Sequence, residues 1–366
     1  MQRHFRRYIC GVTAALCLFS IFPCQSLAVS TSASSAILVD VDSGRVLYEQ
    51  NADAKMLIAS TTKILTALVA IEEGNLSDTV TVSREAALTE GSSMYLQEGE
   101  QLTLETLLYG LMLCSGNDAA VAIADHIGGS QEKFVVLMNK RAAELGMEHS
   151  SFANPNGLDH ERHYSTARDM ALLARAAVEN ETLVRIASTQ SVTIGGRTMT
   201  NHNKLLRYVD GCIGLKTGYT KAAGRTLVSC AERNGQRLVA VTLQDGNDWA
   251  DHQALYEYGF STYPAKRCAV LGQPLCTETV LNGSAGTVPL IAAETVSWPL
   301  GQEERVEQRI ELTKPLAAPV FAGEVVGEAV FSVDGREVGR TALLCGADVL
   351  PRLDNAIETL KTGLPG

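Results

Sequence analysis

The sequence lacks the features that mark several large classes of protein. Basic residues are not in excess: 31 Lys and Arg stand against 41 Asp and Glu, which gives a formal net charge of −10. A nucleic acid is therefore not an expected partner, because contacts with the phosphate backbone need a basic surface. The chain has no internal repeat and no low-complexity segment, and 46% of its 366 residues are hydrophobic and 20% charged. This composition excludes a disordered, collagen-like or coiled-coil chain, and the length suggests two domains.

Beyond residues 1–28, the sequence also lacks any segment that is apolar for long enough to span a membrane. Within residues 1–28, basic residues precede an apolar run over 8–22, and Ser26 and Ala28 supply the small side chains that a signal peptidase inspects. This order is that of a secretory signal peptide. An uncleaved membrane anchor is the alternative, but the run is shorter than the roughly 20 residues that a spanning helix needs. We expect cleavage after Ala28, which takes the net charge from −10 to −13 and leaves a soluble chain outside the cytoplasm.

Cysteine and histidine do not form a recognisable metal pattern. Three of the nine cysteines lie in residues 1–28, and the other six are Cys114, Cys212, Cys230, Cys268, Cys276 and Cys345. An even number in an exported protein permits disulfides, but no spacing is that of a zinc site. Cys114 and Cys230 lie in apolar runs, where buried free thiols are expected, and Cys268 with Cys276 is the pair to test first for a disulfide. His160 and His163 have a spacing that could hold zinc but lack a third ligand. We expect no metal and no other cofactor.

Strand and helix patterns follow one another in a definite order after residue 28. Residues 36–39 and 45–48 are β-rich and flank a turn, and residues 227–231 and 238–243 form a second strand pair. Between these pairs the apolar residues recur at helical spacing in residues 60–71, 102–113, 118–127, 130–145 and 166–178. Strands at both ends of one unit most simply form a single antiparallel sheet against which the helices pack.

The composition changes after Tyr263-Pro264 to Val, Thr, Pro and Gly without helical periodicity. Asp334-Gly335 is a hairpin turn, and the alternation of apolar and charged residues is that of strands. We expect a small all-β, sandwich-like domain over residues 265–350. Residues 351–366 form a short amphipathic tail without Trp, Phe or a basic excess, so we expect a helix that docks on this domain, and at most weak peripheral membrane contact.

Ser60-Thr61-Thr62-Lys63 is the first pattern that can carry chemistry. Helical periodicity begins here, and residues three apart on a helix share a face, with about 5–6 Å between Cβ atoms. A serine hydroxyl is a poor nucleophile until a base takes its proton. Lys63 can be that base only when neutral, which requires burial or a nearby cation. The apolar face of the predicted helix supplies burial, and the N–H groups at its start point to where an oxyanion would form.

The same spacing occurs a second time, so alone it has limited weight. Ser130-Gln131-Glu132-Lys133 follows two glycines and begins another amphipathic helix. There we expect Ser130 to cap the helix and Lys133 to be solvated. A structural role is thus as good an interpretation of Ser60 until other residues are considered.

Two further motifs supply those residues. Ser115-Gly116-Asn117 lies between two helical runs, where polar side chains can project into a cleft, although by itself it could merely cap the second helix. Lys216-Thr217-Gly218 precedes the second strand pair, which predicts a position on an edge strand facing the helices. A second Lys-Thr-Gly at residues 361–363 ends the terminal helical stretch, where Lys favours the helix dipole and Gly the C-cap, so that copy needs no function.

The three motifs, in this order, are those of penicillin-binding proteins and class A β-lactamases. The chain resembles the serine D-alanyl-D-alanine carboxypeptidases, the low-molecular-mass penicillin-binding proteins, over nearly all of its length after residue 28. Other stretches typical of this family are Asn154-Pro155-Asn156-Gly157-Leu158, His163-Tyr164-Ser165-Thr166-Ala167-Arg168-Asp169 and Gly218-Tyr219-Thr220-Lys221-Ala222-Ala223-Gly224. The resemblance implies an α+β fold, with a β-lactamase-like catalytic domain over residues 29–264, and an enzyme that is exported to the cell-wall side of the bacterial membrane.

The resemblance also implies catalytic roles for three residues. Ser60 would attack the carbonyl between two D-alanines at the end of a peptidoglycan stem peptide, with Lys63 as general base. Ser115 would relay the proton to the leaving amine, and water would then hydrolyse the acyl-enzyme. A penicillin would acylate the same serine and leave slowly.

Substrate binding would fall to Asn117, Lys216, Thr217, Gly218 and Tyr219. Asn117 would hydrogen-bond the substrate backbone, and Lys216 and Thr217 would hold its terminal carboxylate. Lys216 would also keep Lys63 deprotonated, because a like charge nearby disfavours the ammonium. The backbone N–H groups of Ser60 and Tyr219 would form the oxyanion hole.

The chain departs from the family in two places. Many members have an arginine after the last strand of the sheet that assists at the carboxylate end, whereas this chain reads Leu243-Gln244-Asp245-Gly246-Asn247-Asp248-Trp249. Carboxylate binding would then rest more heavily on Lys216 and Thr217. The terminal amphipathic stretch is also shorter than that of membrane-anchored members.

Two other functions stay open from the sequence. A β-lactamase of class A deacylates with a glutamate in Glu-x-x-Leu-Asn, and no such string lies between Ser115 and Lys216. A non-catalytic wall-binding protein of the same fold would be expected to lose Ser60, Lys63 or Lys216, and all three are present. The second alternative requires a blocked cleft.

Overall fold

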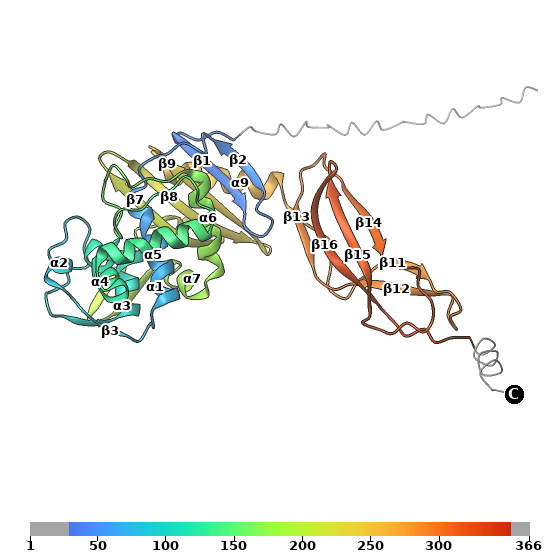
Figure 1. Cartoon of the computed structure of the whole chain (residues 1–366). Coiled ribbons are helices and arrows are strands. Elements are labelled where there is room, and N and C mark those ends of the chain that lie inside the picture. The colour runs from blue at the N-terminus through green and yellow to red at the C-terminus, as the bar shows by residue number, and fades with distance from the viewer. Residues whose placement is uncertain (1–28, 353–366) are drawn as a thin grey trace, which may run out of the picture.

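The computed structural model describes residues 29–352, which form two bodies joined end to end (Figure 1). The predicted signal peptide at 1–28 lies outside the described residues, as do most of the terminal amphipathic stretch and the second Lys-Thr-Gly. Among the helices between residues 29 and 352, none is long and apolar enough to cross a membrane.

The first body is built on one antiparallel sheet whose strands come from both ends of its sequence. Its order is β2 (Val46–Gln50), β1 (Ser35–Asp40), β9 (Gln236–Leu243), β8 (Gly224–Arg233) and β7 (Cys212–Thr220). β1 and β9 pair with Ile37 opposite Val241, and β7 and β8 pair with Lys216 opposite Val228. The predicted single sheet is therefore confirmed, and the Lys-Thr-Gly motif lies on the edge strand β7 as expected.

A helical block covers one face of this sheet. It consists of α1 (Lys63–Glu73), α2 (Arg84–Ala87), α3 (Leu104–Leu113), α4 (Asn117–Gly128), α5 (Gln131–Glu144), α6 (Ala167–Glu179) and α7 (Glu181–Ala187). α1 lies at the centre, since residues 63–70 are all buried. Two two-stranded sheets, β3 (Thr79–Thr81) with β4 (Gln101–Thr103) and β5 (Ser191–Ile194) with β6 (Arg197–Thr200), complete this side. The short helix α8 (Leu205–Tyr208) packs through Leu205 on the opposite face. The predicted helical runs all appear, with ends displaced by a few residues.

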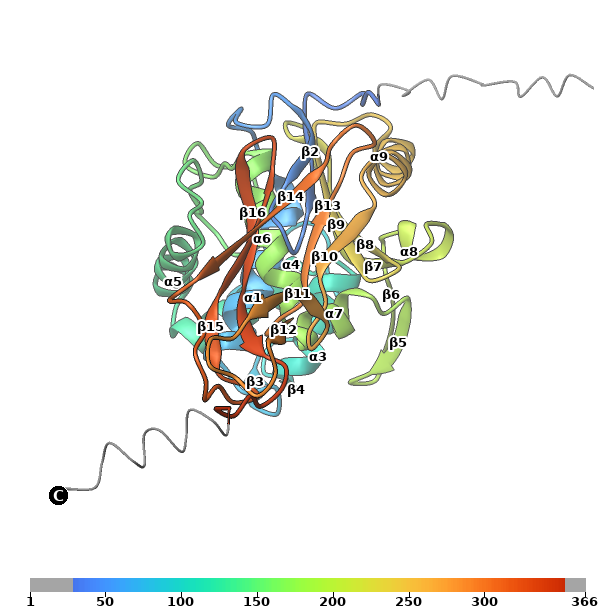
Figure 2. The same ribbon diagram turned by 90° about the vertical axis from the view of Figure 1, so that its right-hand side faces the viewer.

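A helix that the periodicity did not predict covers the opposite face. α9 (Asp248–Thr262) packs through Leu255 and Tyr256 on a cluster that includes Leu38 and Leu227. Viewed from the side of the C-terminal domain, α9 and α5 lie on opposite flanks of the sheet (Figure 2). The buried side of α9 contains Asp248, Asp251 and His252, so its sequence has no clear apolar stripe.

The C-terminal domain is all β, as predicted. One sheet has the order β11 (Pro274–Thr279), β12 (Thr287–Ala292), β16 (Arg336–Cys345), β15 (Val325–Val333) and β14 (Val306–Leu312), and β10 (Ala265–Ala269) pairs with β13 (Val296–Pro299). Asp334 and Gly335 have φ angles of 48° and 75°, so they form the predicted hairpin turn between β15 and β16. Its core contains Val288, Leu290 and Phe331.

One arginine joins the two bodies. Arg45, in the turn before β2, donates to both carboxylate oxygens of Glu304, at 2.6 and 2.8 Å, and to the carbonyl of Pro299 at 2.6 Å. Its guanidinium lies 4.9 Å from the ring centroid of Tyr263 and 5.6 Å from that of Trp298. The partly buried hydrogen bonds between Arg45 and Glu304 raise the pKa of the arginine and lower the pKa of the glutamate.

A buried carboxylate and the free cysteines are two further features away from the site. Asp40, at the end of β1, is 3% exposed and accepts from the Ser43 amide and hydroxyl and from Nε2 of Gln236. The turn folds over this carboxylate and β9 covers it. All six cysteines in residues 29–352 are free thiols, so the suggested pair of Cys268 and Cys276 is not bonded.

Candidate active site

Ser60 and Lys63 meet at the start of α1. Ser60 lies in a 3₁₀ turn over Ala59–Thr62, and Lys63 is the first residue of α1. The sequence predicts an α-helix from residue 60, and the tighter 3₁₀ turn is the difference. In such a turn side chains three apart eclipse one another. Nζ of Lys63 accordingly lies 2.9 Å from Oγ of Ser60.

Burial disfavours the charged form of Lys63. The side chain is 0% exposed, and burial, with a smaller contribution from the charge of Lys216, holds its pKa well below the usual value, while Asp118 acts in the opposite direction. Nζ also lies 2.7 Å from Oδ1 of Asn117 and 2.6 Å from the carbonyl of Asn156. As an ammonium, Lys63 donates in all three contacts, and when it is neutral two N–H groups can keep the contacts with Asn117 and Asn156 while the lone pair takes the one with the hydroxyl of Ser60.

Ser115 and Asn117 lie at the junction of α3 and α4. Ser115 is buried with a φ of 60°, and the amide N–H of Gly116 donates to the carbonyl of Gly110 at 3.1 Å. The N-cap of α4 is Gly116, without a capping side chain, so Asn117 is not the helix cap that its sequence context allowed. Its Oδ1 instead faces Lys63, and its Nδ2 donates to the carbonyl of Glu90 at 2.6 Å.

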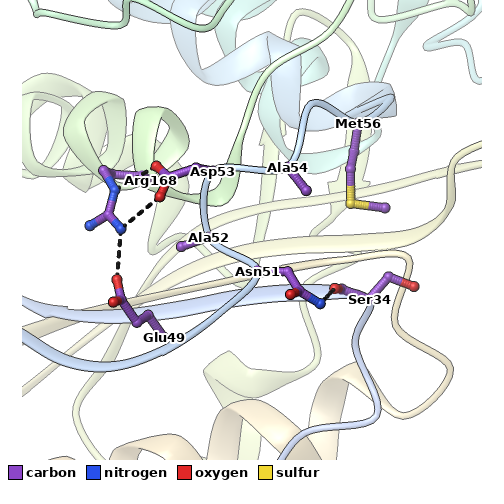
Figure 3. Close-up of a pocket in the computed structure, with 8 residues that line it drawn as sticks. All are labelled: Ser34, Glu49, Asn51, Ala52, Asp53, Ala54, Met56 and Arg168. Carbon is purple, nitrogen blue, oxygen red and sulfur yellow. Dashed lines mark hydrogen bonds and ion pairs between the residues drawn. The ribbon is translucent and has the colours of Figure 1, made fainter.

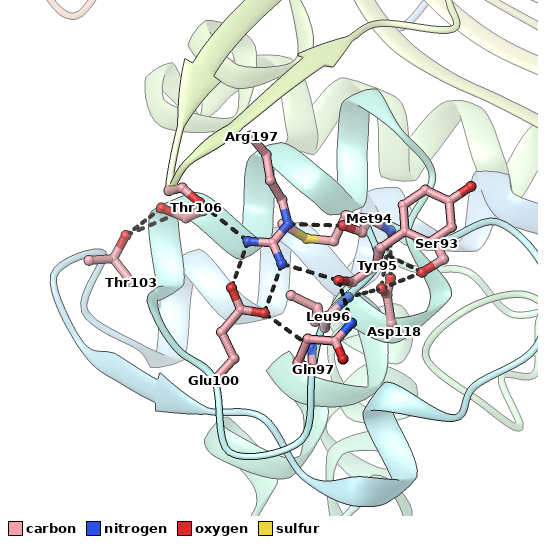
Figure 4. A network of polar contacts seen from close by, with 11 residues as sticks. Ser93, Met94, Tyr95, Leu96, Gln97, Glu100, Thr103, Thr106, Asp118 and Arg197 are labelled. Carbon is pink, nitrogen blue, oxygen red and sulfur yellow. Dashed lines mark hydrogen bonds and ion pairs between the residues drawn. The ribbon is translucent and has the colours of Figure 1, made fainter.

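Asp118 holds the loop beside this junction, a role that was not predicted from the sequence. Its buried carboxylate accepts from the amides of Met94 and Leu96, each at 3.1 Å, and from the hydroxyl of Ser93 at 2.6 Å (Figure 4). On the outer side of the loop Arg197 pairs with Glu100 at 2.6 Å. The available signal was an acid in the first turn of a predicted helix, which also suits the helix dipole.

Lys216 lies on β7 beneath the cleft. It is 1% exposed, burial lowers its pKa to about 7, and its Nζ donates to the carbonyl of Thr217 at 3.0 Å. Gly218 passes close to the nucleophile: a Cβ there would lie 3.0 Å from the amide nitrogen of Ser60 and 2.3 Å from Oγ1 of Thr226. Tyr219 is the most exposed member of the predicted set, at 65%.

An open cleft of about 510 Å³ unites the three motifs. Its lining consists of Ser60, Ser92, Ser115, Asn201, His202, Lys204, Arg207, Thr217, Gly218, Tyr219, Arg225, Asp248 and Trp249. Five of the eight predicted site residues are in this lining. The other three, Lys63, Asn117 and Lys216, are buried, and Lys63 links Ser60 to Asn117. The structure thus brings the predicted residues together.

A slightly larger pocket, of about 600 Å³, lies elsewhere, between β2 and the start of α6 (Figure 3). Its charged residues are paired with one another: Arg168 lies 2.7 Å from Asp53 and 2.7 Å from Glu49. The size of a pocket therefore does not identify the candidate active site in this protein. The buried amine beside a hydroxyl identifies it.

His163 has a structural position beneath the 3₁₀ turn. Its Nδ1 accepts from the amide of Ala153 at 3.1 Å, and burial lowers its pKa to about 4, so the neutral ring carries its proton on Nε2. Nε2 donates to Oγ1 of Thr62 at 2.7 Å, and that hydroxyl donates to the carbonyl of Ala59 at 2.8 Å. Both ring nitrogens are thus engaged in supporting the turn that carries Ser60. Within residues 29–352 no group of three or more His, Cys, Asp or Glu is placed to hold a metal.

Comparisons with known proteins agree with this geometry. Residues 24–247 match the Peptidase S11 family, described as D-alanyl-D-alanine carboxypeptidase, and residues 265–350 match the C-terminal domain of penicillin-binding protein 5. Among curated proteins, D-alanyl-D-alanine carboxypeptidase DacF of Bacillus subtilis is 33% identical over 87% of this chain and 86% of its own length. DacC of Escherichia coli is 35% identical over 87% of this chain and 84% of its own length.

Solved structures show the same similarity over both domains. Penicillin-binding protein 5 from Haemophilus influenzae superposes with a TM-score of 0.70 at 30% identity, covering 88% of this chain and 98% of that one. PBP3 from Streptococcus pneumoniae gives a TM-score of 0.76 at 26% identity, covering 87% and 100%. The resemblance and the fold class predicted from the motifs are confirmed, and the chain belongs to the S11 family of D-alanyl-D-alanine carboxypeptidases.

Proposed function

We propose that the protein hydrolyses the terminal D-Ala-D-Ala bond of peptidoglycan stem pentapeptides through an acyl-enzyme on Ser60. The observation that carries this proposal is the fully buried Lys63, whose Nζ lies 2.9 Å from Oγ of Ser60 and whose pKa is held low. A neutral amine at this distance can take the hydroxyl proton as the oxygen attacks. Family membership supports the same reaction class.

The reaction has two steps on this site. Oγ of Ser60 bonds to the carbonyl carbon of the penultimate D-alanine, Lys63 takes the proton, and the backbone N–H groups of Ser60 and Tyr219 stabilise the oxyanion. The C–N bond then breaks: Lys63 gives its proton to Oγ of Ser115, which lines the same cleft, and Ser115 passes its own hydroxyl proton to the amine of the departing D-alanine, so that Lys63 is neutral again. Water attacks the resulting ester, Lys63 takes a proton from the water, and that proton passes to Oγ of Ser60 as the ester C–O bond breaks.

Substrate binding uses the walls of the cleft. Asn117 is buried, with its Oδ1 against Lys63 and its Nδ2 on the carbonyl of Glu90, so its proposed hydrogen bond to the peptide backbone requires one of these contacts to open. Thr217 in the cleft lining and the field of Lys216 favour the terminal carboxylate. Gly218 lets β7 approach Ser60 closely. A β-lactam has an acyl group and a carboxylate in a similar arrangement, so we propose that it acylates Ser60 and leaves slowly. The open cleft speaks against a wall-binding protein that has lost its activity.

We also propose the setting and the domain limits. The protein acts outside the cytoplasm on the cell-wall side, with residues 1–28 removed as a signal peptide. Residues 29–264 form the catalytic domain, residues 265–350 the β domain, and residues 351–366 a short tail with at most weak peripheral membrane contact. The match of residues 265–350 to a known C-terminal domain supports the second limit.

Mapping of the penicillin adduct tests the assignment of the nucleophile. We expect benzylpenicillin to leave a covalent adduct that peptide mass spectrometry places on Ser60, and Ser60→Ala to form none. Ser130→Ala is the matched control, because Ser130 has the same spacing to a lysine but caps α5 by accepting from the Lys133 amide at 3.3 Å. An adduct on Ser115 or Ser130 in the wild-type protein would overturn the proposal.

A further inference from the structure

The cations of the cleft differ in how accessible they are to a substrate. Lys216 is 1% exposed, its Nζ donates to a carbonyl, and burial brings its pKa down to about 7. It is therefore a poor sole partner for a carboxylate that enters from solvent. Arg225 lines the same cleft with a side chain that is 41% exposed. Arginine keeps its charge and presents N–H groups in a fork that matches a carboxylate.

Arg225 is placed next to the strand that carries Thr217. It is the second residue of β8 and lies opposite Tyr219 of β7 in the sheet register. Thr217 lies two residues before Tyr219, so its side chain and that of Arg225 are on the same face of the sheet. Both residues line the cleft together with Ser60.

Two residues at the start of α9 hold Arg225 in place. Its Nη2 donates to both carboxylate oxygens of Asp248, at 2.7 and 2.9 Å, and its guanidinium lies 5.3 Å from the ring centroid of Trp249. Asp248 has a side chain that is only 3% exposed. Within residues 29–352, Nε and Nη1 of Arg225 make no hydrogen bond. The contact with Asp248 thus occupies Nη2 and leaves Nε and Nη1 for a ligand.

The remaining cations of the cleft lack such an anchor. Arg207 and Lys204 come from α8 and the residue before it, and within the described chain their side chains form no hydrogen bond or ion pair. A mobile side chain loses rotamer freedom on binding, whereas one already fixed by an ion pair and an aromatic ring does not. Arg225 is therefore the cation best prepared to bind an anion in this cleft.

We propose that Arg225 binds the free C-terminal carboxylate of the substrate, and that Asp248 and Trp249 position its guanidinium. Arg225 then determines that the enzyme cleaves a terminal residue, because a peptide that continues or ends in an amide offers no carboxylate there. This inference rests on the proposed function and assigns a specificity determinant to the same site.

A pair of substrates that differ only at the C-terminus tests the proposal. One is a diacyl-lysyl-D-Ala-D-Ala peptide with a free carboxylate, and the other is its C-terminal amide. We expect Arg225→Gln to lower kcat/KM for the acid by about 10- to 100-fold, as for the loss of a charged hydrogen bond, and to leave kcat/KM for the amide nearly unchanged. Arg225→Lys, which keeps a cation, is expected to retain part of the preference. Equal losses on both substrates, or no loss on the acid, would overturn the proposal.

The same strand and helix provide a matched control. Arg233, at the far end of β8, pairs with Glu257 of α9 at 2.9 Å and lies 4.8 Å from the ring centroid of Phe260. Arg233→Gln removes a similar anchored arginine away from the cleft and is expected to leave the preference for the acid unchanged. If Arg207→Gln abolishes that preference and Arg225→Gln does not, the carboxylate binds at α8 and the proposal is wrong.

A binding measurement separates this proposal from the proposed function. In the Ser60→Ala background no acyl-enzyme can form, so the Kd of the acid and of the amide peptide is measured by calorimetry. We expect Arg225→Gln to weaken binding of the acid peptide about 10-fold or more, without effect on the amide peptide. Wild-type protein that releases no D-alanine would count against the proposed function, whereas an unchanged Kd ratio would count against Arg225 alone.

Discussion

Lys63 of α1 and Asn117 of α4 meet across the helical block, with 2.7 Å between Nζ and Oδ1. This contact joins the first motif to the second, because Nζ also lies 2.9 Å from Oγ of Ser60. Both side chains are buried, so the position of the amine is fixed before a substrate arrives. Such preorganisation lets the base act without rearrangement of the site.

Removal of the amine should abolish acylation without unfolding the protein. We expect Lys63→Ala to slow acylation by benzylpenicillin by about 100- to 10,000-fold, the range typical of a general base. Circular dichroism checks that the fold is kept. Lys133→Ala is the control, because that lysine has the same spacing to a serine but is exposed. Acylation of Lys63→Ala at the wild-type rate would remove Lys63 from the role of base.

A charge at residue 117 should shift the pH dependence. Burial holds the pKa of Lys63 low, and activity is expected to be lost as pH falls and the amine takes a proton. In Asn117→Asp a carboxylate replaces the amide oxygen beside Nζ and favours the ammonium, which raises the pKa of Lys63. The acid limb of kcat/KM should therefore move to higher pH by about one unit or more. A limb that stays in place, or moves to lower pH, would contradict this account of the amine.

A methyl group at residue 218 should disturb the nucleophile. The Cβ of Gly218→Ala would lie 2.3 Å from Oγ1 of Thr226 and 3.0 Å from the amide nitrogen of Ser60, so the side chain of Thr226, β7 or the 3₁₀ turn must shift. Overpacking of this kind costs about 1–3 kcal/mol in stability, and we expect a loss of about 100-fold or more in kcat/KM, since a displacement near 1 Å has that effect. Gly246→Ala is the control, because no atom lies within 4 Å of its Cβ position. If both variants retain full activity, the close approach has no catalytic consequence.

Neutral His163 should make stability depend on pH. Burial lowers its pKa from 6.5 to about 4, so unfolding takes up a proton between these values and its contribution to stability is lost as pH falls from about 6.5 to 4. At 1.36 kcal/mol per unit, the loss reaches about 3 kcal/mol. Urea unfolding of wild type and His163→Asn at several pH values measures it. The stability difference between the two proteins should be largest near pH 7.5 and shrink toward pH 4, and a difference that grows on acidification would refute the neutral ring.

The sequence was sufficient for the parts of the fold that repeat a local pattern. Alternation predicted the strands, and apolar periodicity predicted most helices. α9 was not predicted from periodicity because its buried side is polar. His252 lies 2.6 Å from the hydroxyl of Ser229 on β8 and 3.1 Å from that of Thr242 on β9. Partners that come from other strands cannot be recognised in the sequence of the helix itself.

The candidate site divides in the same way. Its motif residues were named from sequence because each motif is contiguous, whereas Asp118, His163 and Arg225 act through contacts with distant segments. Arg225 is the clearest example, because residues 243–249, where the resemblance led us to look for an arginine, contain none. Asp248 in that stretch instead pairs with an arginine from the neighbouring strand.

Release of D-alanine is the most direct test of the central claim that Ser60, activated by Lys63, cleaves a terminal D-Ala-D-Ala bond. The chain without residues 1–28 is incubated with a synthetic pentapeptide stem, beside Ser60→Ala, and D-alanine is quantified over time. The predicted result is steady release by the wild type and none by the variant. Release that persists in Ser60→Ala, or its absence from folded wild-type protein, would contradict the account.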